Sequence, residues 1–317
     1  MFEVACVGIL CADVLAKPVD KLPEKGKLEV IDTLQLQVGG CATNAAIGLS
    51  KMGIKTALIG KVGDDGFGRF LQEVLKSKKV DISGLKVDGG VPTSASVVTI
   101  SRDGERSILH CLGSNSRFSF EDVNTEIVRN SKILFIAGTF LMPEFDGEGT
   151  ERLVKLAVDS GVICCMDTAW DSSGQWMDKI KDSLAYLDWF LPSYEEAREL
   201  SKEDKPEDMA RLFQTKGVKN VVVKLGKNGC YVKPDSKEGF YAPTYNDVQV
   251  VDTSGAGDSF CAGFLTGLVK GWDLKTCAKF ANAVGSHCVM EIGTTTGIKP
   301  MHEIFHFLSQ HEPGVGI

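Results

Sequence analysis

Residues 251–269 read VDTSGAGDSFCAGFLTGLV, a glycine-rich turn that runs into an apolar stretch. Large apolar side chains recur at every fourth position from Phe260, and this spacing predicts a buried helix that begins near Gly257. The small residues of Gly255–Gly257 allow the backbone to approach a ligand closely, while the free N–H groups and the positive dipole end of the helix attract an anion. The stretch therefore predicts an anion-binding turn at the start of a buried helix.

Asp258 follows this turn directly. As an acid in the first turn of a helix it would stabilise the positive end of the dipole, which is a purely structural role. An anion cradle beside a carboxylate is also the arrangement needed to take a proton from a hydroxyl next to a terminal phosphate. The second interpretation predicts phosphoryl transfer to an alcohol, with Asp258 as the general base.

The rest of the chain alternates short apolar runs with helical patterns. Runs that are apolar on both faces are typical of strands buried between two layers of helices, so this alternation predicts an α/β fold with a mostly parallel central sheet. The expected strands are Val4–Val7, Ala57–Ile59, Ile133–Ala137, Val162–Met166, Trp189–Leu191 and Val221–Leu225, and the expected helices include Phe67–Lys76, Glu151–Ser160 and Met209–Thr215.

Two segments interrupt this alternation, Asp13–Leu36 and Pro92–Leu112. The first is rich in Pro and Lys, and the second contains SASVVTI, a turn at 102–104 and ERSIL, which together predict a hairpin. Because both segments flank the first βα unit, we expect them to join in space as a small antiparallel β-sheet that forms a lid. The expected division is a large domain of residues 1–12, 37–91 and 113–317 and a lid of residues 13–36 and 92–112.

Composition limits the partners of the chain. Its 317 residues carry a formal net charge of −7, which argues against a nucleic-acid or anionic-membrane surface, because such partners require a concentrated positive field. The first residues have no basic region ahead of their apolar stretch, and no uncharged apolar run reaches the length of about 18 residues that a membrane span needs. The ten cysteines are scattered, with no CxxC pair. We expect a cytoplasmic protein with free thiols.

A second glycine-rich segment, Val38–Gly39–Gly40–Cys41–Ala42–Thr43–Asn44, enters another predicted helix. The glycine pair allows a close approach of the backbone to a ligand, and Asn44 offers donors and an acceptor just inside the helix start. A plain turn followed by a capping asparagine is the structural alternative. The segment marks a second candidate binding site without identifying its ligand.

Together, the two glycine-rich segments resemble the signatures of the PfkB carbohydrate kinases, also called the ribokinase-like family. The similarity continues, in order, through an early strand ending near Asp13, GKVGDDGFG at 60–68, LPSYEE at 191–196, VKLGKNG at 223–229 and FANA at 280–283. Nearly the whole chain is covered. The resemblance implies an ATP-dependent sugar kinase with a Rossmann-like central sheet, a β-lid and a need for Mg²⁺. The sequence has no GxxxxGK[ST] P-loop, no protein-kinase HRD or DFG element, and no GxGxxG after the first strand.

The resemblance also assigns roles to individual residues. Asp258 would be the base, and the backbone of Gly255, Ala256 and Gly257 would form the anion hole. Asp13, Gly39, Gly40 and Asn44 would hold sugar hydroxyls; Lys224, Gly226, Gly229 and Asn282 would border the nucleotide; and Asp252, Ser254, Cys288, Glu291 and Gly293 would hold a monovalent cation such as K⁺, mainly through their backbone, with Asp252 also near the substrate. Structural alternatives are a turn residue at Asp13, a hairpin turn at Gly226 and Gly229, and a polar helix residue at Asn282.

One position departs from the family pattern. Where the family has an Asn-x-x-Glu element that helps to arrange magnesium and phosphate, this chain has Ser193 in place of the asparagine and retains Glu196. A serine hydroxyl can still bind a metal-bound water, so the resemblance implies that Ser193 borders the nucleotide and that Glu196 holds Mg²⁺ through water. In the structural alternative, Glu195 and Glu196 are first-turn acids of a helix.

The nature of the substrate stays open at this stage. A free sugar or sugar-like alcohol is the leading hypothesis, a nucleoside is the alternative within the family, and a catalytically inactive sugar sensor is a third reading that the intact GAGD segment argues against. Arg106, in the expected lid hairpin, could reach a carboxylate or phosphate of the substrate or be a solvated strand residue. In SASVVTI both faces of the strand carry apolar groups, so we expect two lids to pair as a homodimer that buries the outer face.

Overall fold

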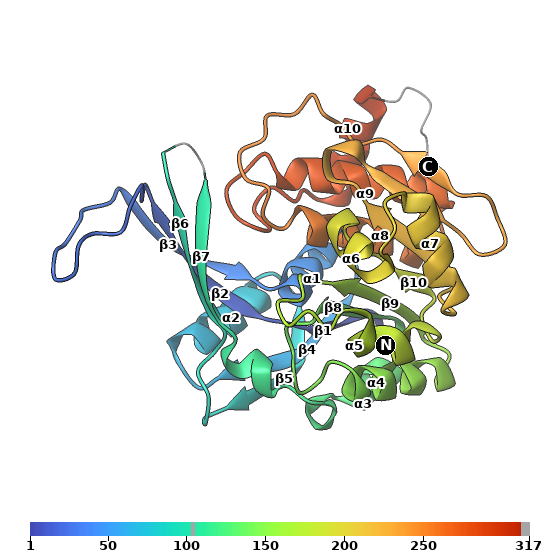
Figure 1. The fold of residues 1–317 in the computed structure, drawn as a ribbon, viewed down its shortest axis with the longest axis horizontal. Coiled ribbons are helices and arrows are strands. Elements are labelled where there is room, and N and C mark those ends of the chain that lie inside the picture. Colours follow the sequence, from blue (N-terminus) through green and yellow to red (C-terminus); the bar gives the residue numbers. More distant parts are fainter. Residues whose placement is uncertain (103–104, 312–317) are drawn as a thin grey trace.

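The computed structural model describes residues 1–102 and 105–311. In this part of the chain nine strands form the central sheet, in the spatial order β13 (Phe240–Ala242), β12 (Cys230–Lys233), β11 (Asn220–Lys224), β10 (Trp189–Phe190), β9 (Ile163–Thr168), β8 (Ser131–Thr139), β1 (Phe2–Gly8), β4 (Thr56–Gly63) and β5 (Asp81–Asp88). The strands from β11 to β5 pair in parallel, whereas β12 and β13 add an antiparallel edge. The predicted mostly parallel α/β fold is thus confirmed (Figure 1).

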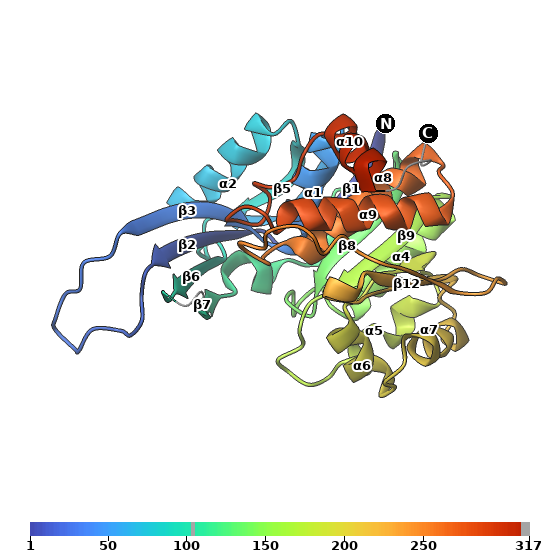
Figure 2. The same ribbon diagram turned by 90° about the horizontal axis from the view of Figure 1, so that it is seen from above.

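Helices cover both faces of this sheet (Figure 2). One layer contains α1 (Cys41–Lys51), α2 (Gly66–Ser77), α8 (Ala256–Lys270), α9 (Leu274–Cys288) and α10 (Met301–His311), and the other contains α3 (Thr125–Arg129), α4 (Glu148–Asp159), α5 (Met177–Leu184), α6 (Tyr194–Ser201) and α7 (Pro206–Thr215). Along β1, Val4 and Cys6 pack in the core under the first layer. Ala5 and Val7 pack in the core under the second. Because alternate side chains enter two different cores, the strands are continuous apolar runs in the sequence.

The two segments that interrupt the alternation join in a second, smaller sheet. Its order is β3 (Thr33–Gly39), β2 (Cys11–Lys17), β6 (Ala95–Ile100) and β7 (Arg106–Cys111), and it projects from the body of the molecule (Figure 1). The pairs β2–β3 and β6–β7 are antiparallel as predicted, whereas the central pair β2–β6 is parallel. Residues 103 and 104 of the predicted turn lie outside the described residues. The exact lid boundaries stay a prediction, since β2 and β3 each run across one of them.

The two faces of the lid differ in character. Alternate side chains of β2 and β6, such as Asp13 and Val98, face the body and line a small cavity against it. On the outer face, Leu36, Val97 and Leu109 lie in register across the sheet, and their exposed fractions are 39%, 42% and 69%. The lid therefore has an uncovered apolar outer face.

Within residues 1–102 and 105–311, the helices are too short or too polar to cross a lipid bilayer. The ten cysteines carry free thiols, and most of them are buried.

Candidate active site

The glycine turn leads directly into the predicted buried helix, α8. Gly255 caps the helix with φ of 74° and ψ of 1°, and α8 begins at Ala256. A β carbon at Gly255 would clash with the backbone of Thr294, so glycine is required both for the conformation and for the close approach. Ala256 and Gly257 line a large cavity, and the first N–H groups of a helix have no partners within the helix. The turn can therefore present N–H groups to an anion in that cavity.

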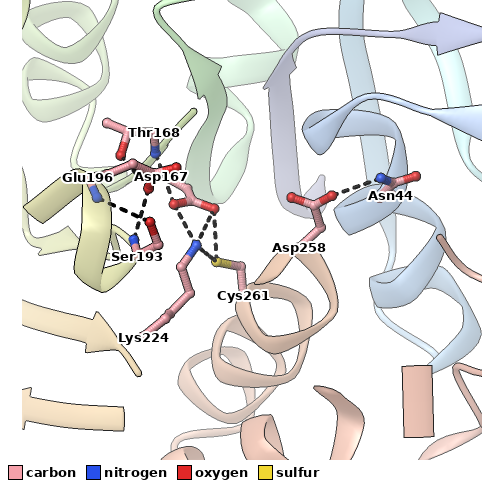
Figure 3. A network of polar contacts seen from close by, with 8 residues as sticks. All are labelled: Asn44, Asp167, Thr168, Ser193, Glu196, Lys224, Asp258 and Cys261. Carbon is pink, nitrogen blue, oxygen red and sulfur yellow. Dashed lines mark hydrogen bonds and ion pairs between the residues drawn. The ribbon is translucent and has the colours of Figure 1, made fainter. Parts of the chain in front are cut away.

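Asp258 lies in the first turn of α8 and faces Asn44 of α1 across the site (Figure 3). Asn44 Nδ2 donates a hydrogen bond of 2.8 Å to Asp258 Oδ2. Burial raises the pKa of the Asp258 carboxyl group above its usual value, and the hydrogen bond from Asn44 offsets part of this rise. A carboxylate with a raised pKa is a stronger base than an ordinary aspartate, which suits proton abstraction from a hydroxyl.

Asn44 is not the cap of its helix, so the structural alternative for this residue is wrong. Gly40 occupies the N-cap position of α1, and Asn44 lies inside the helix. Its amide sits between two partners: Nδ2 donates to Asp258, and Oδ1 accepts from Thr294 Oγ1 at 2.8 Å. Because the Asp258 carboxylate only accepts hydrogen bonds, the amide turns its NH₂ end to the base and its oxygen to the Thr294 hydroxyl.

The lid contributes Asp13 to the same region. The Asp13 carboxylate lies against Gly39, where a β carbon would clash with it. Asp13 Oδ1 accepts a weak hydrogen bond of 3.2 Å from Cys11 Sγ. Asp13 is a mid-strand residue, paired with Gln37 and Ser96, and not the turn residue of the structural alternative. The fold thus brings Asp13 to the glycine pair that leads into α1.

Asp252 uses its carboxylate to hold the glycine turn in place. Oδ1 accepts from the Ser254 N–H at 2.8 Å, and Oδ2 accepts from the Gly293 N–H at 2.9 Å. Oδ1 also pairs with Arg106 Nη2 of the lid at 2.9 Å. Arg106 further contacts the hydroxyls of Thr253 and Ser254. In this structure Arg106 is therefore not a solvated strand residue, and it connects the lid to the turn; contact of its guanidinium group with a substrate anion stays a prediction.

Backbone carbonyls beside this turn fit a monovalent cation. The carbonyl oxygens of Ser254 and Thr294 each lie 3.4 Å from the Cys288 thiol, so they converge on one region. A thiol is a weak donor and leaves these carbonyls capacity to bind a cation. The Glu291 carboxylate pairs with Lys299 at 2.9 Å, which is consistent with a role for its backbone rather than its side chain.

A cavity of about 360 Å³ lies beside the glycine turn, a volume typical of small-molecule sites. Its lining includes Lys224, Gly226, Gly229, Gly257 and Asn282. Gly226 and Gly229 lie in the turn between β11 and β12. They are therefore residues of a hairpin turn, as the structural alternative predicts, and they also line this cavity. Asn282 Nδ2 donates to the carbonyls of Ala242 and Pro243 at 3.0 and 3.1 Å. Its amide therefore fixes the chain segment that borders the cavity.

Lys224 forms a buried ion pair at the carboxyl ends of β9 and β11. Its Nζ atom lies 2.7 Å from both carboxylate oxygens of Asp167, whose side chain is 2% exposed (Figure 3). Burial alone would lower the pKa of Lys224, but the Asp167 carboxylate, together with Cys261 and Glu196, outweighs this effect and raises the pKa, so the ammonium group stays charged. The sequence patterns assign no role to Asp167. Its position directly after an apolar strand, at the same sheet edge as Lys224, is the signal that could have found it.

Ser193 and Glu196 form a capping box at the start of α6. Ser193 Oγ accepts from the Glu196 N–H, and Glu196 Oε2 accepts from the Ser193 N–H at 2.9 Å and from Thr168 Oγ1 at 3.0 Å. The structural alternative of a first-turn acid therefore describes Glu196 correctly, without excluding contact of its carboxylate with a hydrated metal. Among residues 1–102 and 105–311, no group of three or more His, Cys, Asp or Glu side chains could hold a metal ion.

Comparison with known proteins gives the same assignment as the geometry. The pfkB family carbohydrate kinase domain matches residues 1–300. The 2-dehydro-3-deoxygluconokinase of Bacillus subtilis (strain 168) is 27% identical and covers 90% of this chain and 91% of its own length. Probable fructokinase-5 of Arabidopsis thaliana is 30% identical over 80% of this chain and 83% of that protein.

Solved structures agree with the sequence comparisons. The structure of Arabidopsis thaliana ribokinase complexed with ribose and ATP superposes with a TM-score of 0.85 at 26% identity, covering 97% of this chain and 98% of that one. The resemblance drawn from the glycine-rich segments is thereby confirmed. The chain belongs to the PfkB family of carbohydrate kinases and is an ATP-dependent carbohydrate kinase.

Proposed function

We propose that this kinase transfers the γ-phosphate of ATP to a hydroxyl of a free sugar or sugar-like alcohol, with Asp258 as the general base and the Gly255–Gly257 backbone as the anion hole. One observation carries the proposal: Asp258, held by Asn44 at 2.8 Å, directly follows a glycine turn whose residues line the large cavity. A base and an anion cradle separated by one peptide can act on a hydroxyl and on the phosphate that it attacks.

The residues divide the reaction between them. ATP binds in the cavity along Gly226, Gly229 and Asn282, with its terminal phosphate at the glycine turn. Asp258 takes the proton of the attacking hydroxyl, and the N–H groups of the turn stabilise the charge that develops on the transferred phosphoryl group. Asp13 and Asn44, from the lid and α1, orient the other hydroxyls of the sugar.

Two ions complete this assignment. Family membership implies the use of Mg²⁺ with ATP, and Glu196 would hold it through water while Ser193 borders the phosphates. A monovalent cation, K⁺ before Na⁺, would bind the carbonyls around Ser254 and Gly293, where large, weakly charged ions suit backbone oxygens. It would supply a fixed positive charge that stiffens the turn.

The charges on the sugar side favour a neutral substrate. Among the described residues that line the small cavity under the lid, Arg106 is the one cation, and Asp252 neutralises it. Asp13 in the same lining adds a carboxylate that pairs with no cation among residues 1–102 and 105–311. A substrate carboxylate or phosphate would enter a negative field there, whereas hydroxyl groups can donate to these carboxylates.

A substrate panel tests the function directly. Release of ADP would be measured with fructose, ribose, 2-dehydro-3-deoxygluconate, tagatose 6-phosphate and adenosine, each at equal concentration and with a no-sugar control. We expect turnover with a neutral sugar. Turnover with adenosine instead would identify the nucleoside alternative, and sugar binding without any ADP release would identify an inactive sensor.

We further propose a homodimer in which two lids cover each other's outer faces. The support is the uncovered apolar row of Leu36, Val97 and Leu109 across the lid sheet. Sedimentation at micromolar concentration should show a dimer, and Leu109→Lys should dissociate it. The control is Val87→Lys on β5, an equally accessible apolar position away from the lid, which should leave the dimer intact. A monomeric wild type would contradict this proposal.

The free, mostly buried thiols support a location in the reducing cytoplasm, where such cysteines stay unpaired. Cell fractionation followed by the kinase assay would test this location.

A further inference from the structure

We propose that Lys51 is a positioning residue for the base, because its ammonium group holds the loop that fixes Asn44. Lys51 lies in the last turn of α1. Its Nζ atom donates to the carbonyl oxygens of Thr295 at 2.7 Å, Ile298 at 3.0 Å and Thr296 at 3.3 Å. This inference rests on the proposed role of Asp258.

The number of donors on the Lys51 ammonium group equals the number of carbonyl oxygens that it contacts. An ammonium group has three donors and no acceptor, and here three carbonyls of one irregular loop surround it. The loop between α9 and α10 has no regular helix or strand over residues 292–298, and the bond from the Ile298 N–H to the Thr295 carbonyl at 3.3 Å is a single turn contact within it. Lys51 supplies a fixed positive charge to the carbonyls of this irregular segment.

The same loop reaches the base through Thr294. Thr294 Oγ1 lies 2.8 Å from Asn44 Oδ1 and 2.8 Å from the Val38 carbonyl oxygen, and Asn44 Nδ2 lies 2.8 Å from Asp258 Oδ2. Asn44 and Lys51 are seven residues apart on α1, so they share one face of the helix, two turns apart. Helix α1 therefore contacts the loop at two points, through Asn44 beside Asp258 and through Lys51.

This arrangement gives Lys51 an effect on catalysis and not only on stability. Without the ammonium group, the loop loses three of its contacts and Thr294 is no longer held against Asn44. The Asn44 amide can then rotate, and the carboxylate of Asp258 loses the hydrogen bond that aims it. The carbonyls of Ser254 and Thr294, proposed above for a monovalent cation, lie in or beside the same loop. Lys51 and that cation would hold the segment through different carbonyls.

The test compares Lys51→Ala, Lys51→Met and Lys51→Arg with the control Lys299→Ala, using a sugar on which the wild type turns over. Lys299 lies at the end of the same loop but pairs with the Glu291 carboxylate, so its removal leaves the three carbonyls untouched. We expect Lys51→Ala and Lys51→Met to lower kcat by roughly ten- to a hundredfold, the range for a slightly misplaced catalytic group, with KM for ATP changed by less than about twofold. Lys51→Arg, which keeps the charge, should recover most of kcat.

Chemical rescue separates positioning from packing. Propylammonium replaces the atoms that Lys51→Ala removes, so it should restore kcat in a saturable way, whereas tetramethylammonium should not. The rescue should also be visible without turnover, as slower hydrogen exchange in residues 293–298. Lys51→Ala in an Asp258→Asn background should cause little further loss of kcat, because two residues that act through one step are not additive.

Three outcomes would overturn the inference: a Lys51→Met enzyme as active as Lys299→Ala, a loss of kcat that propylammonium leaves unchanged, or an equal loss of ATP binding. These outcomes are distinct from failure of the proposed function. If Asp258→Asn keeps its activity, the base assignment itself is wrong. If Asp258→Asn is inactive while Lys51→Met is active, Asp258 keeps its assignment as the base and Lys51 has no positioning role.

Discussion

The nucleotide side and the sugar side of the site are built in different ways. The nucleotide cavity measures about 360 Å³ and is lined by residues of the β11–β12 turn, α8, α9 and the segment before them, which all belong to the main body. The cavity under the lid measures about 30 Å³, and seven of its eleven lining residues come from the lid strands β2, β3, β6 and β7. In the proposed assignment, the nucleotide cavity has room for a ligand in this structure, whereas the space under the lid is small, so we expect the lid to move when a sugar binds.

The contacts that close the lid explain how such a movement is coupled to the chemistry. Arg106 reaches from β7 to Asp252, Thr253 and Ser254, the residues that lead into the glycine turn. A few polar contacts can break and reform at modest cost, unlike the apolar core of the main body. Closure of the lid over a sugar therefore also orders the turn that receives the phosphate. The predictions below disturb the shared centre first, then the sugar side, then the turn, and finally the main body.

The largest effect is expected from Asp258→Asn, which removes basicity and keeps the shape. Asp258 stands where the two sides meet, so its loss should affect the chemical step and neither binding step. We expect kcat to fall roughly 10²- to 10⁴-fold while the protein folds and binds ATP, measured by single-turnover kinetics and nucleotide titration. Retention of more than about a tenth of the activity would leave Asp258 with only the role of a first-turn helix acid.

Arg106→Met should act mainly on the sugar side, with a smaller loss of kcat because its contacts also reach the residues that lead into the glycine turn. A hydrogen bond to a charged group contributes roughly 1.5–3 kcal/mol, so we expect KM for the sugar to rise about tenfold or more and KM for ATP to change by less than about twofold. Steady-state kinetics with each substrate varied in turn measure both values.

The control for this variant is Arg102→Met. Arg102 is also a lid arginine, but it pairs with Asp20 and its side chain is 74% exposed, so its removal should change neither KM. If the two variants behave alike, Arg106 does not close the lid. If Arg106→Met harms only anionic substrates, its guanidinium group binds the substrate and not the turn.

The main body and the lid also differ in how well the sequence predicts their strands. The central strands could be predicted because each is a local run of residues buried on both faces, as in β1 and β8. Strand β5 escapes prediction, since it lies at the sheet edge and mixes exposed with buried positions. The small sheet could be foreseen as a pair of interrupting segments, but its parallel central pair depends on how two hairpins meet in space.

The same distinction holds within the site. Asp258 and the glycine turn could be predicted because the anion cradle and the base are adjacent in the sequence. The Asn44–Asp258 and Arg106–Asp252 contacts join residues from opposite ends of the chain, and local patterns carry no information on such pairs. The Asp252 side chain is an example: the family resemblance places it near the substrate, which stays a prediction, but local patterns do not show that its oxygens accept from Ser254 and Gly293 and pair with Arg106.

Potassium should have a smaller effect than either variant, because it would act on the turn from outside the reacting groups. We expect a higher kcat/KM in potassium chloride than in sodium chloride or tetramethylammonium chloride at constant ionic strength. The reason is that a large monovalent ion would order the carbonyls of Ser254 and Thr294 and thereby the N–H groups of the turn. Equal kcat/KM in all three salts would show that the turn needs no added cation.

The smallest effect concerns the stability of the main body and comes from Asp146, in the loop between β8 and α4. Asp146 Oδ2 accepts from the Met142 N–H at 2.9 Å, while Oδ1 is buried without a partner among the described residues. Burial raises the pKa of Asp146 to about 7. The folded protein therefore binds this proton more tightly than the unfolded chain does.

The sign of the pH dependence follows from that rise. The stability linked to the Asp146 proton is fully present below the ordinary pKa of aspartate and is lost as the pH rises from there through about 7. Asp146→Asn replaces the titrating group by a neutral one of the same shape, so between about pH 5 and about pH 8 the wild-type Tm should fall several degrees further than that of the variant. Asp178→Asn, at a side chain that is 82% exposed, should keep the wild-type slope. Because Asp146 touches neither cavity, both KM values should stay within about twofold of the wild type. Parallel curves of Tm against pH for the wild type and Asp146→Asn would mean that the Asp146 carboxylate is solvated or paired in solution. A change in either KM would mean that the loop after β8 is part of the active site.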